Sequence, residues 1–237
     1  VALRFPLALD AANSQFLCDV PFGAMARQPY YEVPRHLAAQ RKVFTPETYR
    51  HAAGDWPVLH WVDCADDASA LAVANNGVPG WQWNDGALIA SLLRSGTKIA
   101  DGAMQPQPGA LDNGVHEYEF AFRAHSPLET EAAPALGRVV NRKPVAFPGL
   151  GKAAGTAKQM ISFDRANLSV SSLRPTADGW ILRVYETLGR KTSTSLHSDY
   201  GAFRLFESDL TERDWSACDA GNLNFKPLEI KTFKLVF

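Results

Sequence analysis

Two tryptophans stand two positions apart beside a glycine-rich turn, in the stretch VPGWQWNDG. Because alternate residues of a strand point to the same side, Trp81 and Trp83 would present both rings on one face. An indole can cover the apolar face of a sugar ring, so the pair could form a stacking platform for carbohydrate. Packing in the core, or against another domain, would use the same alternation, and both interpretations stay open.

Arg94 is the second residue whose type and position suggest chemistry. It ends the apolar stretch ALIASLL, which is typical of a strand, and the loop that follows is rich in Gly and Pro. A guanidinium carries five hydrogen-bond donors in a rigid planar fork, and these donors suit carboxylate and hydroxyl groups. A structural salt bridge at the rim of a sheet would explain the same placement.

Motifs that would define a reaction or a metal site do not stand out. No glycine-rich phosphate loop follows a strand, and neither HExxH nor GxSxG occurs. The six histidines lie in unlike contexts, and none pairs with another at helical spacing. Asp and Glu are numerous, so counting them does not exclude a carboxylate pair of the kind that hydrolyses glycosides.

Charge and cysteine content exclude several classes of function. The formal net charge is -1, so no overall field attracts nucleic acid or an anionic membrane. No apolar run approaches the ~20 residues of a membrane-spanning helix, and no signal peptide is recognisable. Cys18, Cys64 and Cys218 are far apart, which fits a reducing compartment better than a disulfide framework and favours a cytoplasmic location.

Alternation of apolar and polar residues is the dominant periodic signal. HEYEFAFRAH places His116, Tyr118, Phe120 and Phe122 on one face, as in a half-buried antiparallel strand. WILRVYE and LEIKTFKLVF also predict strands, and so do VLHWVD, SALAVAN, ALIASLL, LSVSSL, TSTSLHS and AFRLFE. Turn sequences such as Asn-Asp-Gly separate these segments. Helical periodicity is scarce, with two turns predicted at most for PRHLAAQRKVF. The pattern predicts an all-β chain with an antiparallel β-sandwich.

Two stretches lack periodicity. Residues 97–114 contain prolines and glycines, and loops of this length inside compact domains are often functional. Residues 134–158 are rich in Gly, Pro and Ala, and we interpret them as a loop or linker, or as one strand wrapped in loops. The chain therefore divides into a main β-sandwich part at 1–133, the stretch 134–158, and a terminal β-sandwich part at 159–237.

Six segments, spread over nearly the whole chain, follow a recognisable order. CDVPFGAMARQP fits the pattern D-[IV]-P-[FY]-G-x-x-x-R. HWVDCADDASALAVANNGVPGWQWNDGALIASLLRSG fits W-x-D followed by L-x-L-S-L-L-R-S, and DNGVHEYEFAFRAH fits D-x-G-x-H-E-F-x-Y-A-L-x-P-H. LSVSSLRPTADGWILRVYETLGR fits V-x-x-S-A-x-K followed by L-x-L-R-L-Y-E-x-x-G. FRLFESDLTERD and FKPLEIKTFKLVF fit the closing N-L-L-E-R and F-x-P-F-E-I-x-T patterns. In this order the segments resemble the C-terminal β-domain of glycoside hydrolase family 38, the α-mannosidases.

The resemblance implies a fold and an activity. The implied fold is all-β: an antiparallel β-sandwich, supersandwich-like and similar to galactose mutarotase, with a smaller C-terminal β-sheet region. The implied activity, for the parent protein, is that of a retaining, zinc-dependent α-mannosidase. The family's catalytic α/β barrel and helical bundle have no counterpart in this sequence. No catalytic residue, metal or cofactor is therefore expected in this chain, and zinc is expected in the missing catalytic domain.

The resemblance also implies a partner and a site. The expected partner is a carbohydrate substrate, held together with the catalytic barrel of the same protein, and neither nucleic acid nor a membrane is expected. In family members an arginine near this point reaches the sugar-binding cleft, so Arg94 is a candidate to hold sugar hydroxyls. Trp81 and Asn75 are further candidates for substrate binding, at the family's tyrosine and asparagine. Glu207 matches the closing motif, whereas that motif's arginine is not matched.

Two other interpretations stay open beside the enzyme fragment. The chain could be a free-standing carbohydrate-binding module that uses Trp81 and Trp83, or a purely structural domain that supports a barrel. Residues upstream of Val1 distinguish them. A barrel with His-x-Asp zinc ligands would favour the enzyme or the structural domain, whereas a signal peptide or a stop would favour the module. The opening on Val1 is expected of a cut or processed terminus.

Overall fold

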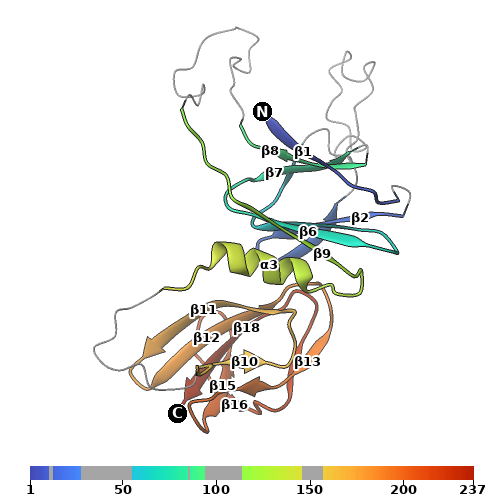
Figure 1. Cartoon of the computed structure of the whole chain (residues 1–237). Helices are drawn as coiled ribbons and strands as arrows, with labels where there is room; N and C mark the ends of the chain where they lie inside the picture. The colour runs from blue at the N-terminus through green and yellow to red at the C-terminus, as the bar shows by residue number, and fades with distance from the viewer. Residues whose placement is uncertain (11–12, 28–54, 85, 94–113, 146–156) are drawn as a thin grey trace, which may run out of the picture. The chain divides into compact units, whose positions relative to one another are not determined.

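The structure is a computed structural model, and it describes residues 1–10, 13–27, 55–84, 86–93, 114–145 and 157–237 (Figure 1). The chain forms two compact units. The first comprises Val1–Val20 and Met25–Arg142, and the second comprises Pro21–Ala24 and Lys143–Phe237. Strands dominate both units, which confirms the predicted all-β antiparallel fold.

The first unit contains two sheets. A four-stranded sheet has the order β1 (Ala2–Pro6), β8 (Ala87–Ser91), β7 (Gly80–Asn84) and β4 (Trp56–Pro57). A five-stranded sheet has the order β3 (Gly23–Arg27), β2 (Gln15–Val20), β5 (Trp61–Ala65), β6 (Ala70–Asn75) and β9 (Phe120–His125). The paired strands run antiparallel, with β5 and β9 on either side of β6.

An apolar core joins residues from both sheets of the first unit. Phe16 and Cys18 of β2 and Val73 of β6 belong to the same buried cluster as Trp81 of β7 and Leu88 of β8. Buried residues recur at every second position of β7, as the pleat of a half-buried strand requires. Burial of each large apolar side chain contributes roughly 1.5–3 kcal/mol. These two sheets enclose a shared core, as the predicted antiparallel β-sandwich fold class requires.

A helix, α3 (Ala132–Asn141), covers the five-stranded sheet and packs on β5, β6 and β9 (Figure 1). The interpretation of 134–158 as loop, linker or strand is therefore wrong for its first residues. Gly137 lies so close to the sheet that a Cβ there would stand 2.5 Å from Cδ1 of Trp61. Pro134 is tolerated because it lies in the first turn, where its missing N–H is not needed. A proline and a glycine within ten residues conceal the helical signal.

The second unit is the smaller sandwich. Its main sheet has the order β11 (Leu168–Thr176), β12 (Gly179–Glu186), β18 (Ile230–Val236), β15 (Arg204–Ser208) and β16 (Ser216–Cys218). Two short pairs accompany it, β10 (Ser162–Phe163) with β14 (Leu196–His197) and β13 (Thr192–Thr194) with β17 (Leu223–Phe225). Leu182 and Phe233 of the sheet share a buried cluster with Phe225 of β17.

The Ala-Asp-Gly sequence makes the predicted turn between β11 and β12. Gly179 is required there because a Cβ would stand 2.1 Å from the carbonyl oxygen of Leu235 on the neighbouring strand β18. The backbone of the hairpin end thus approaches the next strand more closely than any side chain permits.

Most predicted strands are present, although several are shorter than predicted. HEYEFAFRAH enters the sheet only at Phe120, and His116 and Tyr118 precede the strand with their rings stacked at 6.4 Å between centroids. The weak helical signal PRHLAAQRKVF and the predicted loop 97–114, apart from Gly114, lie outside the described residues.

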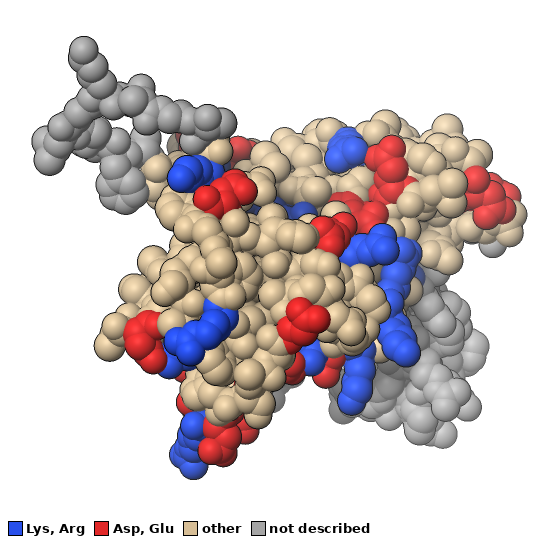
Figure 2. Space-filling model, turned by 90° about the horizontal axis from the view of Figure 1, so that it is seen from below, with Lys and Arg blue, Asp and Glu red and all other residues tan. Residues whose placement is uncertain are grey.

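The described part of the chain contains no helix that is long and apolar enough to cross a membrane. On the face drawn in Figure 2, acidic and basic side chains lie next to one another. This mixture agrees with the formal net charge of -1.

Candidate functional site

The two tryptophans of the expected stacking platform lie in the core of the first unit. Trp81 is 0% exposed and Trp83 is 2% exposed, and both point to the same side of β7. The indole Nε1 of Trp81 donates to the carbonyl oxygen of Val78 at 2.8 Å, and its ring stacks on Phe5 with centroids 6.4 Å apart. Neither ring has a free face for a sugar, so the platform is corrected to core packing.

Asn75 holds a turn at the end of β6. It is fully buried, and its Oδ1 accepts a hydrogen bond from the backbone N–H of Val78 at 2.8 Å. Its own N–H donates to the carbonyl oxygen of His60, and its carbonyl oxygen accepts from the amide of Asn141 on α3. The asparagine is required here by local geometry, because a short amide can close a turn on its own backbone.

Arg94 lies outside the described residues, so its place in a sugar-binding cleft stays a prediction. The strand that precedes it is present as predicted, and β8 ends at Ser91. Glu207, the matched residue of the closing motif, lies on β15 and accepts a hydrogen bond from Nζ of Lys231 at 2.5 Å. Of the predicted site residues, Asn75 and Trp81 lie close together, because both hydrogen-bond to Val78, but both are fully buried.

A fully buried carboxylate that accepts four hydrogen bonds was not singled out as a site from the sequence. Glu186, at the end of β12, is fully buried. Its Oε1 accepts from the N–H of Leu188 and the amide of Asn167, each at 2.8 Å. Its Oε2 accepts from the N–H groups of Arg190 at 2.9 Å and Leu228 at 3.0 Å. The Y-E-x-x-G pattern within the fourth motif segment was the available signal for it.

Asn167 extends this arrangement to a third strand. Its amide also donates to Oγ1 of Thr192 at 2.7 Å, and its carbonyl oxygen accepts from both the N–H and the hydroxyl of Thr187 at 2.9 Å. Four chain segments meet at these buried polar groups. Such a network, when all its members are satisfied, fixes a single arrangement of the loops.

The protonation state of Glu186 argues against a role as an acid catalyst. Burial raises the pKa of this carboxyl, but the N–H groups of Leu228 and Leu188, the amide of Asn167 and the N–H of Arg190 together outweigh it, so the pKa is lowered. A general acid needs a raised pKa and a free path to the substrate. Glu186 is instead an ionised structural anchor for two turns.

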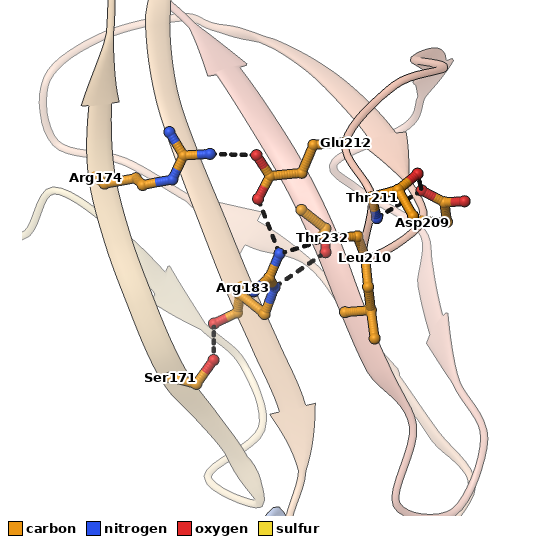
Figure 3. A network of polar contacts seen from close by, with 8 residues as sticks. All are labelled: Ser171, Arg174, Arg183, Asp209, Leu210, Thr211, Glu212 and Thr232. Atoms are coloured by element: carbon orange, nitrogen blue, oxygen red, sulfur yellow. Dashed lines mark hydrogen bonds and ion pairs between the residues drawn. The ribbon is translucent and has the colours of Figure 1, made fainter.

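A second network fixes the loop between β15 and β16 to the main sheet of the second unit (Figure 3). The carboxylate of Glu212 bridges Arg174 on β11 and Arg183 on β12, with 2.8 Å between Oε1 and Nη2 of Arg183. Arg183 also donates to the carbonyl oxygen of Leu210 and to Oγ1 of Thr232, each at 3.3 Å. These groups satisfy one another, so the network acts as a structural clamp.

A shallow groove of about 540 Å³ lies beside β15, β16 and β18, and charged groups line it. Glu207 is paired with Lys231, while Asp209 and Glu229 each accept a hydrogen bond from a nearby backbone N–H. Hydrogen bonds from Thr211 lower the pKa of Asp209. Glycoside hydrolysis needs one protonated carboxylic acid opposite an ionised carboxylate. In the described structure, Glu207, Asp209 and Glu229 serve as acceptors of hydrogen bonds from neighbouring groups of the protein.

No three His, Cys, Asp or Glu side chains gather to hold a metal ion within the described ranges. The cysteines are free, and burial raises the pKa of Cys18 to about 12 and that of Cys218 to about 11. Such thiols are protonated at neutral pH and are poor ligands and nucleophiles. The described residues therefore do not fit the zinc that the family resemblance implies, and zinc stays a prediction for the part outside this chain.

Comparison with known proteins bears on the second unit. Residues 167–233 match the family described as "Glycosyl hydrolases family 38 C-terminal beta sandwich domain". This confirms the resemblance that the motifs indicated, and the family 38 segment runs from β11 into β18, with Glu186, Asn167 and the Glu212 clamp inside it.

Two solved structures share the fold of nearly the whole chain. One is an α-mannosidase from Enterococcus faecalis V583, with a TM-score of 0.73 and 14% sequence identity. The other is a protein in glycosyl hydrolase family 38 from Enterococcus faecalis, with a TM-score of 0.72 and 13% identity. In both cases the aligned region covers 98% of this chain, but only 25% and 26% of the solved chains. The chain therefore spans about a quarter of their length. No curated protein sequence matches it.

Proposed function

We propose that this chain is the non-catalytic β-part of a glycoside hydrolase whose full-length form hydrolyses α-mannosidic bonds. The main observation that supports this proposal is the match of residues 167–233 to the family 38 C-terminal domain. The shared fold with an α-mannosidase over 98% of the chain supports it, although that similarity concerns the fold alone. Because this chain covers only 25% of the solved α-mannosidase, a separate catalytic part can lie elsewhere in the parent protein.

The contacts of the described carboxylates support a structural role for this part. Glu186 accepts four hydrogen bonds from the surrounding loops, and Glu212 joins two arginines of the sheet. Groups held in this way stabilise the loops between strands. We assign the bond-breaking residues and the zinc to the part of the parent protein that this chain does not include.

Arg94 is the residue of this chain that we propose to contact the substrate in the parent enzyme. It follows β8 and the family pattern L-x-L-S-L-L-R-S, and its guanidinium can donate to several sugar hydroxyls at once. In the parent enzyme Arg94→Ala should lower kcat/KM by roughly ten- to a hundred-fold, which corresponds to about 1.5–3 kcal/mol. An unchanged kcat/KM would show that Arg94 does not contact the substrate.

The free-standing carbohydrate-binding module has lost its main support. That interpretation depended on exposed indole faces, and both Trp81 and Trp83 are buried. Isothermal titration of the chain with mannose and with short α-mannosides tests it directly. We expect no heat of binding from the chain alone.

The experiment that tests the proposed function uses the parent protein and a set of aryl glycosides. We expect turnover of aryl α-mannoside, with little turnover of aryl β-mannoside, α-glucoside or α-galactoside. Turnover of another sugar in the set with no turnover of α-mannoside would keep the glycoside hydrolase and reject the mannoside specificity. No turnover of any sugar would reject the enzyme.

A further inference from the structure

A histidine and an aspartate meet under α3 in the first unit. His125 is the last residue of β9, and Nε2 of its ring lies 3.1 Å from Oδ1 of Asp63 on β5. The side chain of His125 is 1% exposed and that of Asp63 is 9% exposed. Two ionisable groups are thus removed from water at the same place, which is costly unless each satisfies the other.

The strand register explains how these residues meet although β6 lies between them. Asp63 pairs with Ala72 and His125 pairs with Ala70, so the imidazole must reach across β6 to the carboxylate. Both alanines are buried and short, and they leave room for the ring between the sheet and α3. The contact therefore joins three neighbouring strands on the face that the helix covers.

Hydrogen-bond geometry fixes the number of protons on the pair. Nδ1 of His125 lies 2.9 Å from the carbonyl oxygen of Ser126, which can only accept, so Nδ1 carries a hydrogen. Nε2 then faces a carboxylate oxygen. If Nε2 were bare and Asp63 ionised, two lone pairs would face each other in a dry site. One proton must therefore lie between Nε2 and Oδ1, whichever atom holds it more strongly.

We infer that His125 and Asp63 share one buried proton and form a pH-sensitive latch, which holds the connection from β9 to α3 on the five-stranded sheet. The carbonyl oxygen of Ser126 also accepts from the N–H of Glu129, and the carbonyl oxygen of Glu129 accepts from the N–H of Ala132 at the start of α3. The ring of His125 is thus connected to the beginning of the helix by consecutive hydrogen bonds.

Other charged groups on the elements around the latch have partners of their own. Arg123, on the same side of β9, donates to Glu129 at 2.9 Å. Asp19 on β2 accepts from Nδ1 of His60 at 2.9 Å. On α3, Arg138 is the basic residue of the last turn. The charge of Arg142, just after the helix, offsets part of the rise in the pKa of Asp19 that burial causes.

The electrostatics of Asp63 agree with a retained proton. Burial raises the pKa of Asp63, and the nearby His125 lowers it by a smaller amount, so the net direction is upward. Cys64, also of β5, belongs to the core cluster of the sandwich, whereas Asp63 faces the helix side with His125.

Because of the latch, the stability of the folded state should depend on pH in a specific way. In the unfolded chain histidine loses its proton near pH 6.5, whereas the folded pair keeps one proton above that pH. Because the proton between Nε2 and Oδ1 stays bound in the folded state, that state binds more protons than the unfolded chain above about pH 6.5, and stability falls as the pH rises above this value. The folding equilibrium constant should fall by up to about tenfold per pH unit in that window.

The direct test is ¹⁵N NMR of the imidazole of His125 in the 237-residue chain, from pH 5 to pH 9. We expect Nδ1 to stay protonated throughout, and Nε2 to keep the signature of a hydrogen-bonded proton at pH 7.5. His197, which pairs with Asp164 at the surface with 58% of its side chain exposed, is the internal reference. A bare Nε2 at pH 7.5 would overturn the latch, and this measurement needs no variant.

A variant separates the latch from simple packing. In Asp63→Asn the amide can still donate to Nε2, but no extra proton is held, so the fall in stability above pH 6.5 should disappear. Asp164→Asn, the matched change in the exposed pair, should leave the fall in place. Denaturant unfolding above and below pH 6.5 measures this fall in stability. Exchange of the amide hydrogens of β9 and α3 reports it for the first unit. An unchanged slope in Asp63→Asn would contradict the proposal.

Discussion

At the scale of single residues, Glu186 shows how a carboxylate stabilises this fold without acting as a catalyst. It is fully buried and accepts hydrogen bonds from two successive turn residues, Leu188 and Arg190, and from Leu228, 42 positions away. Each hydrogen bond to a charged group contributes about 1.5–3 kcal/mol, less the cost of burying the charge. The net effect is to specify where two loops of the second unit lie.

Glu186→Gln should lower the free energy of unfolding of the second unit by about 2–4 kcal/mol, because an NH₂ group would replace one oxygen that accepts two hydrogen bonds. Urea denaturation of the chain measures the loss. Asp178→Asn is the matched control, since Asp178 is an exposed partner of Lys234 and its substitution should change the free energy of unfolding much less. Equal effects of the two substitutions would mean that the Glu186 arrangement is not important for stability.

The lowered pKa of Glu186 predicts acid sensitivity. A carboxyl whose folded pKa is lower than its unfolded value of about 4.3 contributes stability that is fully present above that value. This contribution is lost as the pH falls through the folded pKa. Wild-type stability, measured by denaturation between pH 5 and pH 2.5, should therefore fall more steeply than that of Glu186→Gln. Parallel curves would show that Glu186 keeps an unshifted pKa.

At the scale of elements, the sequence predicts strands far better than it predicts the helix. Alternation alone indicated β12 and β18, because a strand with one buried face repeats every second residue. α3 has only ten residues and contains Pro134 and Gly137, so its local pattern is weak. Its position depends on the small residues of β6 that it covers, and a contact of this kind between distant segments cannot be seen in a local window.

Long-range contacts also explain the errors at the expected site. Alternation correctly placed Trp81 and Trp83 on one side of β7, but it could not say that the other sheet covers that side. Glu186 was passed over as a site for the same reason, since its partners Asn167 and Leu228 are 19 and 42 positions away. Local pattern gives the direction of a side chain, whereas its function depends on what lies opposite.

Gly137→Ala tests the close approach of α3 to its sheet. Alanine favours a helix by up to ~1 kcal/mol over glycine, but its Cβ would stand 2.5 Å from the ring of Trp61. Overpacking costs about 1–3 kcal/mol, so we expect a net loss of about 1–2 kcal/mol in thermal or urea unfolding. Val139→Ala, at an exposed position of the same helix, should stay within about 0.5 kcal/mol. A stabilised Gly137→Ala would mean that helix and sheet lie further apart.

At the scale of the whole molecule, the proposed function divides the work between this chain and a separate catalytic part of a parent protein. The chain covers about a quarter of the two solved structures that share its fold, and residues 167–233 match the family 38 C-terminal β-sandwich domain. In its second unit, Glu186 and Glu212 hold loops in place. We therefore expect the purified chain to be well folded and to lack hydrolytic activity.

Hydrolysis of an aryl α-mannoside, measured in parallel for the 237-residue chain and for the parent protein that contains it, tests this division most directly. We predict turnover by the parent protein, loss of that turnover when zinc is removed by a chelator, and no turnover by the chain above that of a mock preparation. Turnover by the chain alone, or a folded parent protein that leaves the α-mannoside intact, would contradict it.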